Sequence, residues 1–445
     1  MSKSEKNASD APSSAAARVS PARSVAFDLL RAVLRKSTPL DEALKAHRGL
    51  GLLPPADRGF ARLITAATLR RLGQIDGILD GLLEKPLPDR ASAVRDALRL
   101  GVAQLCFIET KPHAAVDTTV ELVRSRGHAA YAGLTNAVLR RIGREAERRQ
   151  AGGPAGANLP SWLQASWQAA YGAETTAAIA EALMVEPTLD ITVASDPADW
   201  AARLGGEVLS TGSLRLPLSG NITALDGYDQ GTWWVQDAAA AMPARLLGNL
   251  HGKRVIDLCA APGGKTAQLC VAGAKVLAVD RAEKRLRTVH ENLKRLQLNA
   301  DTLVADATVW QPREAVDAVL LDAPCSATGT IRRHPDILHL KTLGDIQRLT
   351  DLQDRLLANA ATMIKPGGQM VYCTCSLQPE EGEQRIAQFL EKFSDFYRLP
   401  ISATEVGGDQ ALINAAGELR TTPADWPDSG GLDGFFAARL GRILS

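Results

Sequence analysis

The stretch Asp257-Leu-Cys-Ala-Ala-Pro-Gly-Gly-Lys-Thr266 decides the fold of the second half of the chain. An acidic residue closes an apolar run, a glycine-containing turn follows, and a helical pattern begins. Such a turn lets backbone amides approach a ligand, and the helix N-terminus supplies further donors. A phosphate-binding P-loop, G-x-x-x-x-G-K-[ST], ends in the same way, but Cys259 stands where its first glycine must be. A dinucleotide-binding G-x-G-x-x-G pattern is absent as well.

From Arg254 onward, short apolar stretches alternate with helical periodicity. The strand candidates are Val255–Leu258, Lys275–Val279, Thr302–Val304, Val316–Leu321 and Gln369–Tyr372, with later ones in Asp395–Leu399 and Gly434–Leu440. The helical stretches between them include Ala282–Leu296 and Ile346–Met363. We therefore expect residues 238–445 to form an α/β domain with a parallel, doubly wound sheet. Its ligands would sit at the carboxyl ends of the strands.

Four aspartates stand at the ends of four successive strand candidates: Asp257, Asp280, Asp306 and Asp322. Each of them alone is more typical of a helix cap. An acidic residue at the tip of the second strand can accept hydrogen bonds from both ribose hydroxyls of an adenosine, and Asp306 is well placed for an adenine amino group. The repetition favours a nucleoside ligand at this edge of the sheet.

Two of the strand ends also carry cysteines, in Asp322-Ala-Pro-Cys-Ser-Ala-Thr-Gly329 and in Tyr372-Cys-Thr-Cys-Ser376. Methyltransferases that act on exocyclic amines commonly place an Asp/Asn-Pro-Pro-aromatic element at the fourth strand, and Cys325 takes the place of its ring. A single buried thiol is usually structural. Two cysteine-bearing strand ends facing one cleft favour a chemical role instead.

Residues 23–149 carry helical periodicity throughout, with prolines between the apolar stripes. We expect an all-α domain, residues 21–150, of six or seven helices. The last part of this domain is rich in arginine, which stacks on bases and forms bidentate hydrogen bonds with phosphates. This part is therefore a candidate RNA contact. A solvated helix face is the alternative. The arginines are Arg124, Arg126, Arg140, Arg141, Arg144, Arg148 and Arg149.

The remaining segments set the domain boundaries. Residues 1–20 are polar and rich in Ser and Ala, and we expect a disordered tail. The linker Ala151-Gly-Gly-Pro-Ala-Gly-Ala157 precedes a small α+β domain, residues 158–237. Two helix-like stretches, Ser161–Tyr171 and Glu174–Leu183, open this domain, and strand candidates run from Leu189–Val193 to Trp233-Trp234.

Composition and charge exclude several classes of protein. No apolar run approaches the roughly 20 residues of a membrane span, and the six scattered cysteines suit a reducing cytosol better than a disulfide framework. None of the seven histidines stands near a cysteine pair at zinc-finger spacing, so we expect no metal.

The first 150 residues hold 25 Lys and Arg against 16 Asp and Glu, and the rest hold 26 against 34. An N-terminal module of net positive charge, joined to a second of net negative charge, suggests an anionic partner for the N-terminal module. The alternative is two ordinary domains whose net charges differ without any functional reason. Nothing requires a partner chain, so we expect a monomer.

Three elements together carry a resemblance: Asp257–Thr266, then Asp322–Gly329 with Arg333-His-Pro-Asp336, and Thr374-Cys-Ser376. They resemble the signature elements of the Sun family of RNA cytosine-5 methyltransferases. Residues 23–149 are similar to the NusB-type RNA-binding domain that precedes the catalytic part of the bacterial 16S rRNA enzyme. The N-terminal resemblance is carried by Leu98-Arg-Leu-Gly101 and Gly133-Leu-Thr-Asn-Ala-Val-Leu-Arg-Arg141, and Asp433-Gly-Phe-Phe436 matches near the end.

The resemblance implies a Rossmann-like, S-adenosylmethionine-dependent methyltransferase domain and small-subunit rRNA as the substrate. It assigns Cys375 as the nucleophile and Cys325 as the residue that helps to release the product. It also implies that the cofactor is bound by Cys259, Ala260, Ala261, Pro262, Gly263, Gly264, Lys265, Asp280, Asp306 and Asp322. A third thiol, Cys373, lies on the same strand face as Cys375 and can be mistaken for the nucleophile.

The implied chemistry is covalent catalysis. A thiolate adds to C6 of cytosine, C5 gains enamine-like character and takes the methyl group, and the C5 proton and the thiolate then leave. A thiol needs a positive neighbour to ionise at neutral pH, and Lys265 or a helix beginning near Pro379 could supply it. Asp322 is the candidate acid for N3, and Cys325 would serve the elimination. The target base must leave any stack, so a flexible or single-stranded site is expected.

Three other functions remain open from the residues. In a DNA cytosine-5 methyltransferase the thiol of the fourth-strand motif, Cys325, attacks and Cys375 is dispensable. A binding or assembly factor with a relic catalytic domain would keep cofactor binding without turnover. A transcription antitermination factor would explain the N-terminal helices but not the catalytic region.

Overall fold

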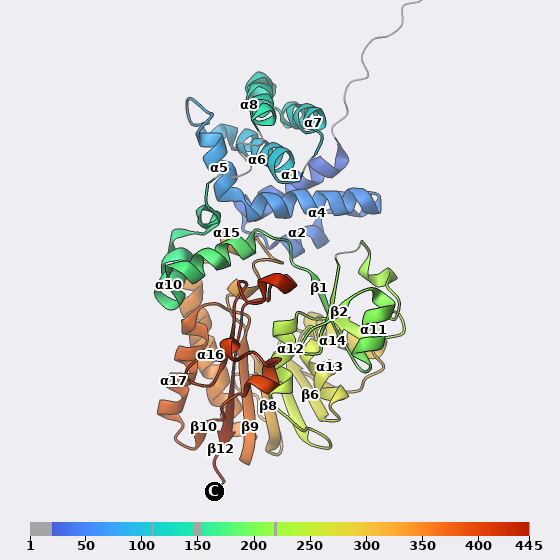
Figure 1. Ribbon diagram of the computed structural model, residues 1–445, viewed down its shortest axis with the longest axis vertical. Helices are drawn as coiled ribbons and strands as arrows, with labels where there is room; N and C mark the ends of the chain where they lie inside the picture. The colour runs from blue at the N-terminus through green and yellow to red at the C-terminus, as the bar shows by residue number, and fades with distance from the viewer. Residues whose placement is uncertain (1–19, 109, 146–152, 218–219, 445) are drawn as a thin grey trace, which may run out of the picture. The chain divides into compact units, whose positions relative to one another are not determined.

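The computed structural model describes residues 20–108, 110–145, 153–217 and 220–444. The chain divides into two compact units, residues 1–154 and 155–445, which are drawn in Figure 1. The expected disordered tail lies outside the described residues apart from Ser20, and so do Arg148 and Arg149 of the arginine-rich segment.

The first unit is all-α, as the sequence predicts. Its helices are α1 (Pro21–Lys36), α2 (Leu40–Ala46), α3 (Arg48–Gly51), α4 (Pro55–Arg70), α5 (Leu72–Asp80), α6 (Ser92–Cys106), α7 (Pro112–Ser125) and α8 (Ala132–Arg144). Proline opens α1, α4 and α7, where its missing N–H costs no helical hydrogen bond. The described part holds eight helices instead of six or seven because α3 is a four-residue segment too short for periodicity to reveal.

Helix α6 is the centre of this unit and packs against α1, α4, α5, α7 and α8. Gly101 on α6 lets α8 approach closely, since a Cβ there would lie 2.8 Å from the Leu139 side chain. Asp96, also on α6, is fully buried and accepts hydrogen bonds of 2.9 Å from each of Arg31, Arg35 and Arg99. One buried carboxylate therefore ties two turns of α1 to α6.

We predict that Asp96→Ala destabilises this unit by about 3 kcal/mol, because Arg31 and Arg35 lose the carboxylate that pairs with them, whereas Arg99 keeps its pair with Asp76. Asp80→Ala is the matched control, since the Asp80 side chain is 63% exposed and pairs with Arg95 alone at its rim. It should cost under about 1 kcal/mol. Native-state hydrogen exchange of the α6 amides measures both opening free energies. Equal losses in the two variants would contradict the role given to Asp96.

The second unit is built on a large sheet whose strands stand in the order β10-β12-β9-β8-β5-β6-β7, with β11 paired to β12. Five neighbouring strands are parallel: β5 (Arg254–Leu258), β6 (Lys275–Asp280), β7 (Asp301–Val304), β8 (Val316–Asp322) and β9 (Ile364–Thr374). The chain runs from β5 outward through β6 to β7, then returns to β8 on the other side of β5. A ligand crevice is expected where this direction changes, at the carboxyl ends of β5 and β8.

The expectation of a parallel sheet is wrong at one edge. Strand β12 (Phe435–Arg442) runs antiparallel between β9 and β10 (Phe396–Arg398), and β11 (Leu419–Thr421) pairs antiparallel with it. A parallel neighbour needs a crossover, usually a helix. The described chain between β10 and β12 contains 3₁₀ turns and the short strand β11 but no α-helix, so β12 enters the sheet in the opposite direction.

Helices cover both faces of the large sheet (Figure 1). They are α12 (Ala238–Arg245), α13 (Gly264–Val271), α14 (Glu283–Arg295), α16 (Leu343–Met363) and α17 (Glu383–Lys392). The short helix α15 (Ile337–Leu340) packs instead with residues 155–184. Alternate strand residues enter different cores: Val255 packs in the core that contains α12, whereas Ile256 packs in the core that contains α16 and α17. This alternation is what buries a parallel sheet on both sides.

The small domain expected before the catalytic part is an antiparallel sheet of order β2-β3-β1-β4. Its strands are β1 (Leu189–Val193), β2 (Glu207–Val208), β3 (Leu214–Leu216) and β4 (Trp233–Val235), with α11 (Pro197–Leu204) alongside. Helix α10 (Ser161–Leu183) precedes it and contains Gly172 at φ 82° and ψ 167°. The two expected helices are therefore consecutive, and they break at the glycine between them.

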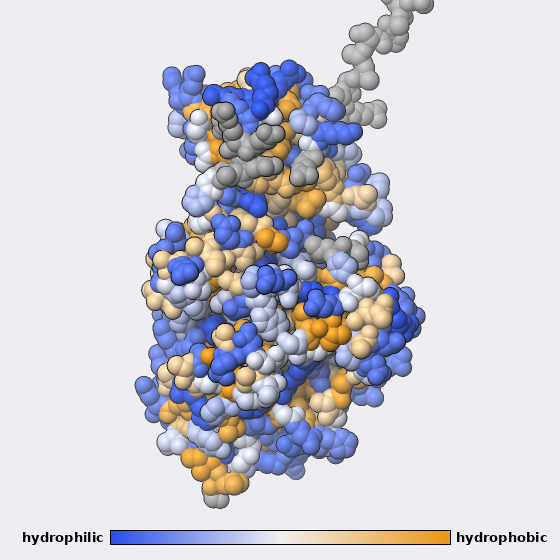
Figure 2. Space-filling model, viewed as in Figure 1, coloured by the Kyte–Doolittle hydropathy of each residue, from blue (hydrophilic) through white to orange (hydrophobic). Residues whose placement is uncertain are grey.

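The surface has mixed polarity. On the face drawn in Figure 2, hydrophilic residues predominate and hydrophobic residues form separate small patches. Within the described ranges, no helix combines the length and the apolar character that crossing a bilayer demands.

Candidate active site

The loop after β5 is a tight turn held by α14. Gly263 has φ +100°, and a Cβ there would come within 3.1 Å of the Val289 side chain on α14. Asn292 donates to the Pro262 carbonyl at 2.9 Å, and Arg285 donates to the Ala261 carbonyl at 2.8 Å. The turn that the sequence predicts from Cys259 to Gly264 is thus present, and α13 begins at Gly264 with Lys265 buried in its first turn.

The predicted aspartates do not share one environment. Asp280 is buried at the end of β6 and accepts hydrogen bonds from the backbone N–H groups of Ala261 (3.3 Å) and Ala282 (3.0 Å). Asp306 follows β7, is exposed, and accepts from the backbone N–H and the hydroxyl of Thr308, which lower the pKa of its carboxyl. Asp306 therefore caps the turn in which it lies. A capping role is the one more typical of a single aspartate.

Asp257 is fully buried on β5, and only one of its oxygens is paired, with the Thr266 hydroxyl at 2.5 Å. Its Oδ1 has no hydrogen-bond partner among the described residues. Burial raises the pKa of this carboxyl to about 7, with a further rise from the charge of Asp322, against the Thr266 hydrogen bond. An unpaired buried acceptor beside the ligand crevice is suited to a group that brings a positive charge or an N–H donor.

The two motif cysteines meet at the carboxyl ends of β8 and β9. Cys325 Sγ and Cys375 Sγ are 3.4 Å apart, and both residues are partly exposed. The hydrogen bond with Cys375, together with burial, raises the pKa of the Cys325 thiol well above its usual value. A base held at this edge of the sheet would meet both sulfur atoms.

Lys265 and Asp322 form an ion pair directly beside the thiols. Lys265 Nζ is 2.8 Å from Asp322 Oδ2 and 4.8 Å from the centre of the Phe435 ring. Burial favours the neutral amine, but the Asp322 charge and the nearby Cys373 and Cys375 outweigh it and raise the pKa of Lys265. Lys265 is thus a permanent positive charge near the thiols. At the other candidate, a helix beginning near Pro379, a three-residue 3₁₀ turn (Pro379–Glu381) comes first and α17 begins at Glu383.

Cys373 occupies a different position from Cys375. It is fully buried within β9, and its Sγ lies 3.6 Å from Asp322 Oδ1. Burial and the charge of Asp322 raise the pKa of the Cys373 thiol well above its usual value. Both sulfurs face the same core, as strand alternation predicts, but only Cys375 stands beyond the end of the strand with part of its surface exposed.

Sequence reasoning missed the groups that hold the loop after Cys375. Helix α10 binds it twice: Tyr171 Oη donates to the Leu377 carbonyl at 2.6 Å, and Trp167 Nε1 donates to Gln378 Oε1 at 2.7 Å. The buried Arg420 donates to the Ser376 carbonyl at 2.5 Å. The polar tips of aromatic residues need partners when buried, but the partners here lie more than 200 positions along the chain.

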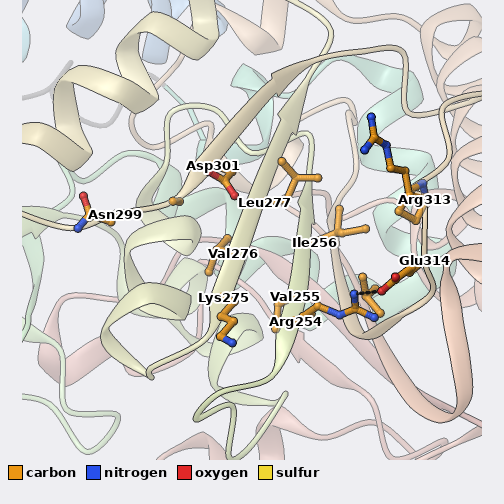
Figure 3. A pocket seen from close by; sticks show the side chains of 13 residues that line it. Arg254, Val255, Ile256, Lys275, Val276, Leu277, Asn299, Asp301, Arg313 and Glu314 are labelled. Atoms are coloured by element: carbon orange, nitrogen blue, oxygen red, sulfur yellow. Dashed lines mark hydrogen bonds and ion pairs between the residues drawn. The ribbon is translucent and has the colours of Figure 1, made fainter.

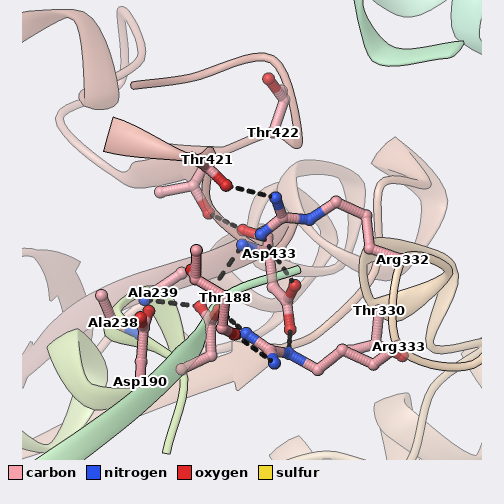
Figure 4. A network of polar contacts seen from close by, with 12 residues as sticks. Thr188, Asp190, Ala238, Ala239, Thr330, Arg332, Arg333, Thr421, Thr422 and Asp433 are labelled. Atoms are coloured by element: carbon pink, nitrogen blue, oxygen red, sulfur yellow. Dashed lines mark hydrogen bonds and ion pairs between the residues drawn. The ribbon is translucent and has the colours of Figure 1, made fainter. Parts of the chain in front are cut away.

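A buried ionic network joins the small sheet, the segment around Arg333 and the start of β12 (Figure 4). Arg333 donates to Asp433 at 2.8 Å, to Asp237 at 2.6 Å and to the Thr188 carbonyl at 3.1 Å. Burial raises the pKa of the Asp433 carboxyl to about 6, whereas Arg333 overcomes burial at Asp237 and lowers the pKa there. The network fixes the small sheet, the Arg333 segment and the start of β12 to one another.

A backbone contact completes this arrangement. The Gly434 amide donates to the Gly329 carbonyl at 2.9 Å, and the Gly329 amide donates to the Cys375 carbonyl at 3.0 Å. A Cβ on Gly329 would lie 1.8 Å from the Gly434 carbonyl oxygen, so glycine is required there. The cysteine loops and the start of β12 are therefore also joined through backbone hydrogen bonds.

A pocket of about 730 Å³ lies at the opposite edge of the sheet, where β5, β6 and β8 begin. Figure 3 shows Arg254, Lys275 and Glu314 among the side chains that line it. It contains none of the predicted site residues, and ligands of doubly wound sheets bind at the carboxyl ends. We therefore place the candidate site at the other edge.

The doubly wound sheet, the glycine turn after β5 and the acidic residues at the next strand ends define a Rossmann-like, S-adenosylmethionine-dependent methyltransferase. The residues fit this cofactor: the unpaired Asp257 oxygen and the carboxylates of Asp280 and Asp306 match a ligand with an ammonium group, a ribose diol and an adenine amine.

Comparison with known proteins makes the assignment specific. Residues 244–441 match the family described as 16S rRNA methyltransferase RsmB/F, and residues 20–144 match the NusB family. Ribosomal RNA small subunit methyltransferase B of Xanthomonas campestris pv. campestris is 35% identical over 437 residues, covering 94% of this chain and 96% of that protein. The protein of the same name from Cronobacter sakazakii is 33% identical over 438 residues, covering 94% and 98%. The chain belongs to the RsmB/F family of 16S rRNA methyltransferases, which confirms the resemblance and its N-terminal NusB-like domain.

Solved structures agree on the fold. The crystal structure of PH0851 covers 94% of this chain and 98% of its own, with a TM-score of 0.72 and 24% identity. The structure of NSun6 from Pyrococcus horikoshii with SFG covers 64% of this chain and 99% of its own, with a TM-score of 0.55 and 19% identity.

The raised pKa of Asp257 predicts a specific dependence of stability on pH. The folded protein keeps this proton up to about pH 7, whereas an unfolded aspartate loses it near pH 4. The contribution of Asp257 to stability therefore falls as pH rises from about 4 to about 7, by roughly 1 kcal/mol per pH unit. Asp257→Asn should gain stability relative to wild type between pH 5 and pH 8, measured by urea unfolding without cofactor.

Asp317→Asn is the control of opposite sign. The hydrogen bond from Lys365 lowers the pKa of the Asp317 carboxyl, so this carboxylate stabilises the fold above about pH 4. The variant should be the less stable protein at neutral pH and approach wild type in acid. Parallel pH profiles for wild type and Asp257→Asn would show that Asp257 is ionised in the folded protein.

Proposed function

We propose that Cys375 is the nucleophile and Cys325 the release residue for cytosine-C5 methylation of 16S rRNA by this family member. The observation that carries this proposal is the 3.4 Å between the two sulfur atoms, next to the ion pair of Lys265 and Asp322. In the proposed reaction the Cys375 thiolate adds to C6 while Asp322, in its acid form, hydrogen-bonds the base and donates its proton to N3, which returns the proton to Asp322 when the thiolate leaves. Methyl transfer to C5 follows, Cys325 takes part in removing the C5 proton, and the thiolate leaves.

Lys265 supports two of these steps. Its positive charge favours the thiolate of Cys375, and its hydrogen bond orients the Asp322 carboxylate toward the site. Cys373 donates to the other oxygen of Asp322, so we propose that it orients this carboxylate and does not attack the base.

S-adenosylmethionine supplies the methyl group. We propose that S-adenosylmethionine is bound by the turn after β5 and by three carboxylates at the ends of the neighbouring strands. The turn consists of Cys259, Ala260, Ala261, Pro262, Gly263, Gly264 and Lys265, and the carboxylates are Asp280, Asp306 and Asp322. The support is their common position at the carboxyl ends of β5, β6, β7 and β8. Two neighbours of the turn were not predicted from sequence: Gln236 and Trp234, from the end of the small sheet, lie within 3.7 Å of the Cβ position of Gly264.

The cysteine roles are tested with unmodified 16S rRNA and radiolabelled S-adenosylmethionine, reading methyl transfer and denaturation-resistant protein–RNA adducts from the same reactions. Cys375→Ala should transfer no methyl group and form no adduct, whereas Cys325→Ala should accumulate the adduct because its release is blocked. Cys270→Ala, a thiol on the outer part of α13 that donates to the Asn299 carbonyl, should behave as wild type. An adduct in Cys375→Ala and none in Cys325→Ala would reverse the assignment and favour the DNA-enzyme arrangement.

We also propose that the NusB-like domain, residues 21–150, binds rRNA, that residues 158–237 form a linking domain, and that residues 238–445 are catalytic. Arg124, Arg140, Arg141 and Arg144 are exposed, as an RNA-contacting face requires. Arg126 has a structural task instead: it pairs with Asp28 and lies over the Phe27 ring. The six cysteines, all within the described residues, form no disulfide, which supports the expected cytoplasmic location.

The RNA-binding role predicts a change in salt dependence. The double variant Arg140→Ala/Arg144→Ala should weaken rRNA binding and reduce the slope of log K against log salt by about 1 to 2, since two phosphate contacts are lost. Arg58→Ala/Arg62→Ala removes two exposed arginines of α4 and is the matched control. Fluorescence anisotropy with an rRNA fragment at several salt concentrations measures both, and identical slopes for the two double variants would refute a specific role of α8.

A further inference from the structure

Glu381 is a fully buried carboxylate that lies between the two cysteine loops. Its Oε1 accepts a hydrogen bond of 2.9 Å from the Ser326 backbone N–H and one of 3.2 Å from Gln353 Nε2. Its Oε2 accepts from the Ser376 hydroxyl at 2.6 Å and from the Ser326 hydroxyl. Both oxygens are therefore satisfied by neutral donors.

Two of the residues that donate to Glu381 stand next to the two thiols in the sequence. Ser326 directly follows Cys325, and Ser376 directly follows Cys375. One side chain therefore bonds the residue next to each thiol, in loops that leave two different strands. The two sulfur atoms lie 3.4 Å apart, so their spacing depends on how the loops that carry them are held.

Glu381 is itself anchored on rigid elements. Its backbone carbonyl accepts from Tyr372 Oη at 2.8 Å and from Thr374 Oγ1 at 3.4 Å, both on β9. Gln353, on α16, donates to Glu381 and also to the Pro324 carbonyl at 2.9 Å, just before Cys325. The bridge is thus fixed to the sheet on one side and to a long helix on the other.

A buried carboxylate is costly unless every lone pair is used, and a hydrogen-bonded charge places its partners more firmly than a neutral group. We infer that Glu381 is a positioning residue, whose bridge between Ser326 and Ser376 holds the Cys325 and Cys375 thiols in contact so that both act on one base. This inference rests on the roles proposed for the two cysteines.

The test measures the thiol contact independently of turnover. Wild type, Glu381→Ala and Glu381→Gln are treated with the thiol oxidant diamide, and the rate of the Cys325–Cys375 crosslink is read by peptide mass spectrometry. We expect Glu381→Ala to crosslink about 10-fold more slowly and to lose about 100-fold in kcat, since misplacing reacting groups by about an ångström costs this much. S-adenosylmethionine binding, measured by calorimetry, should be unchanged because the cofactor turn lies on other strands.

Glu381→Gln separates position from charge. Its amide oxygen can accept from Ser326 N–H and Gln353, while its NH₂ donates to the two serine hydroxyls, which rotate to accept. Crosslinking and kcat should therefore stay within about 3-fold of wild type. Glu391→Gln, an exposed change of the same charge on α17, is the control and should match wild type.

Each outcome decides the question. A normal crosslinking rate in Glu381→Ala, or an equal loss in the Gln and Ala variants, would overturn the inference. If Glu381→Ala does not fold, Ser376→Ala decides instead: it removes one arm of the bridge and should slow crosslinking and kcat about 10-fold, and a wild-type rate would overturn the inference. Failure of the proposed function is distinguishable, because it shows as an adduct in Cys375→Ala whatever Glu381 does.

Discussion

The ion pair between Lys265 and Asp322 joins the two halves of the doubly wound sheet at the point where they diverge. Lys265 follows β5 and belongs to the turn proposed to hold the cofactor, whereas Asp322 ends β8 and begins the loop of Cys325. Buried ion pairs add little net stability, because desolvation offsets their attraction, but they fix the relative position of the groups that carry them. Here the ion pair fixes the position of the turn proposed for the cofactor relative to the thiols proposed to act on the base.

Other buried polar groups extend this constraint outward. Arg333 connects Asp433 and Asp237, and Asp237 also caps α12 by accepting from the Ala239 N–H at 2.8 Å. The neighbouring pair of Arg215 and Asp190, bonded twice at 2.7 Å, joins two strands of the small sheet, and Asp190 accepts from the first N–H of the same helix. The small sheet is therefore part of the site's framework, and it brings Trp234 and Gln236 to the cofactor turn.

Local patterns in the sequence account for the strands, the turn and the two cysteine motifs, because each depends on a few consecutive residues. They also place Cys325 and Cys375 at one edge of the sheet, since parallel strands end together. They do not reveal Glu381, whose importance comes from two serines that lie 55 and 5 positions away in the sequence. Nor do they reveal the direction of β12, which depends on the absence of a crossover helix, or that Asp306 uses its carboxylate within its own turn.

The place of β12 in the sheet also sets the order in which the enzyme can be assembled. This strand is made after β9 and β10, yet it inserts between them, and the Gly434 amide at its start closes onto Gly329. While the chain is being synthesised, β9 has no neighbour on that side, and the Gly329 carbonyl in the Cys325 loop lacks the backbone contact that the Gly434 amide later provides. A nascent chain can therefore fold its helical NusB-like unit from local contacts, but it acquires the paired thiols only after most of its length has been translated.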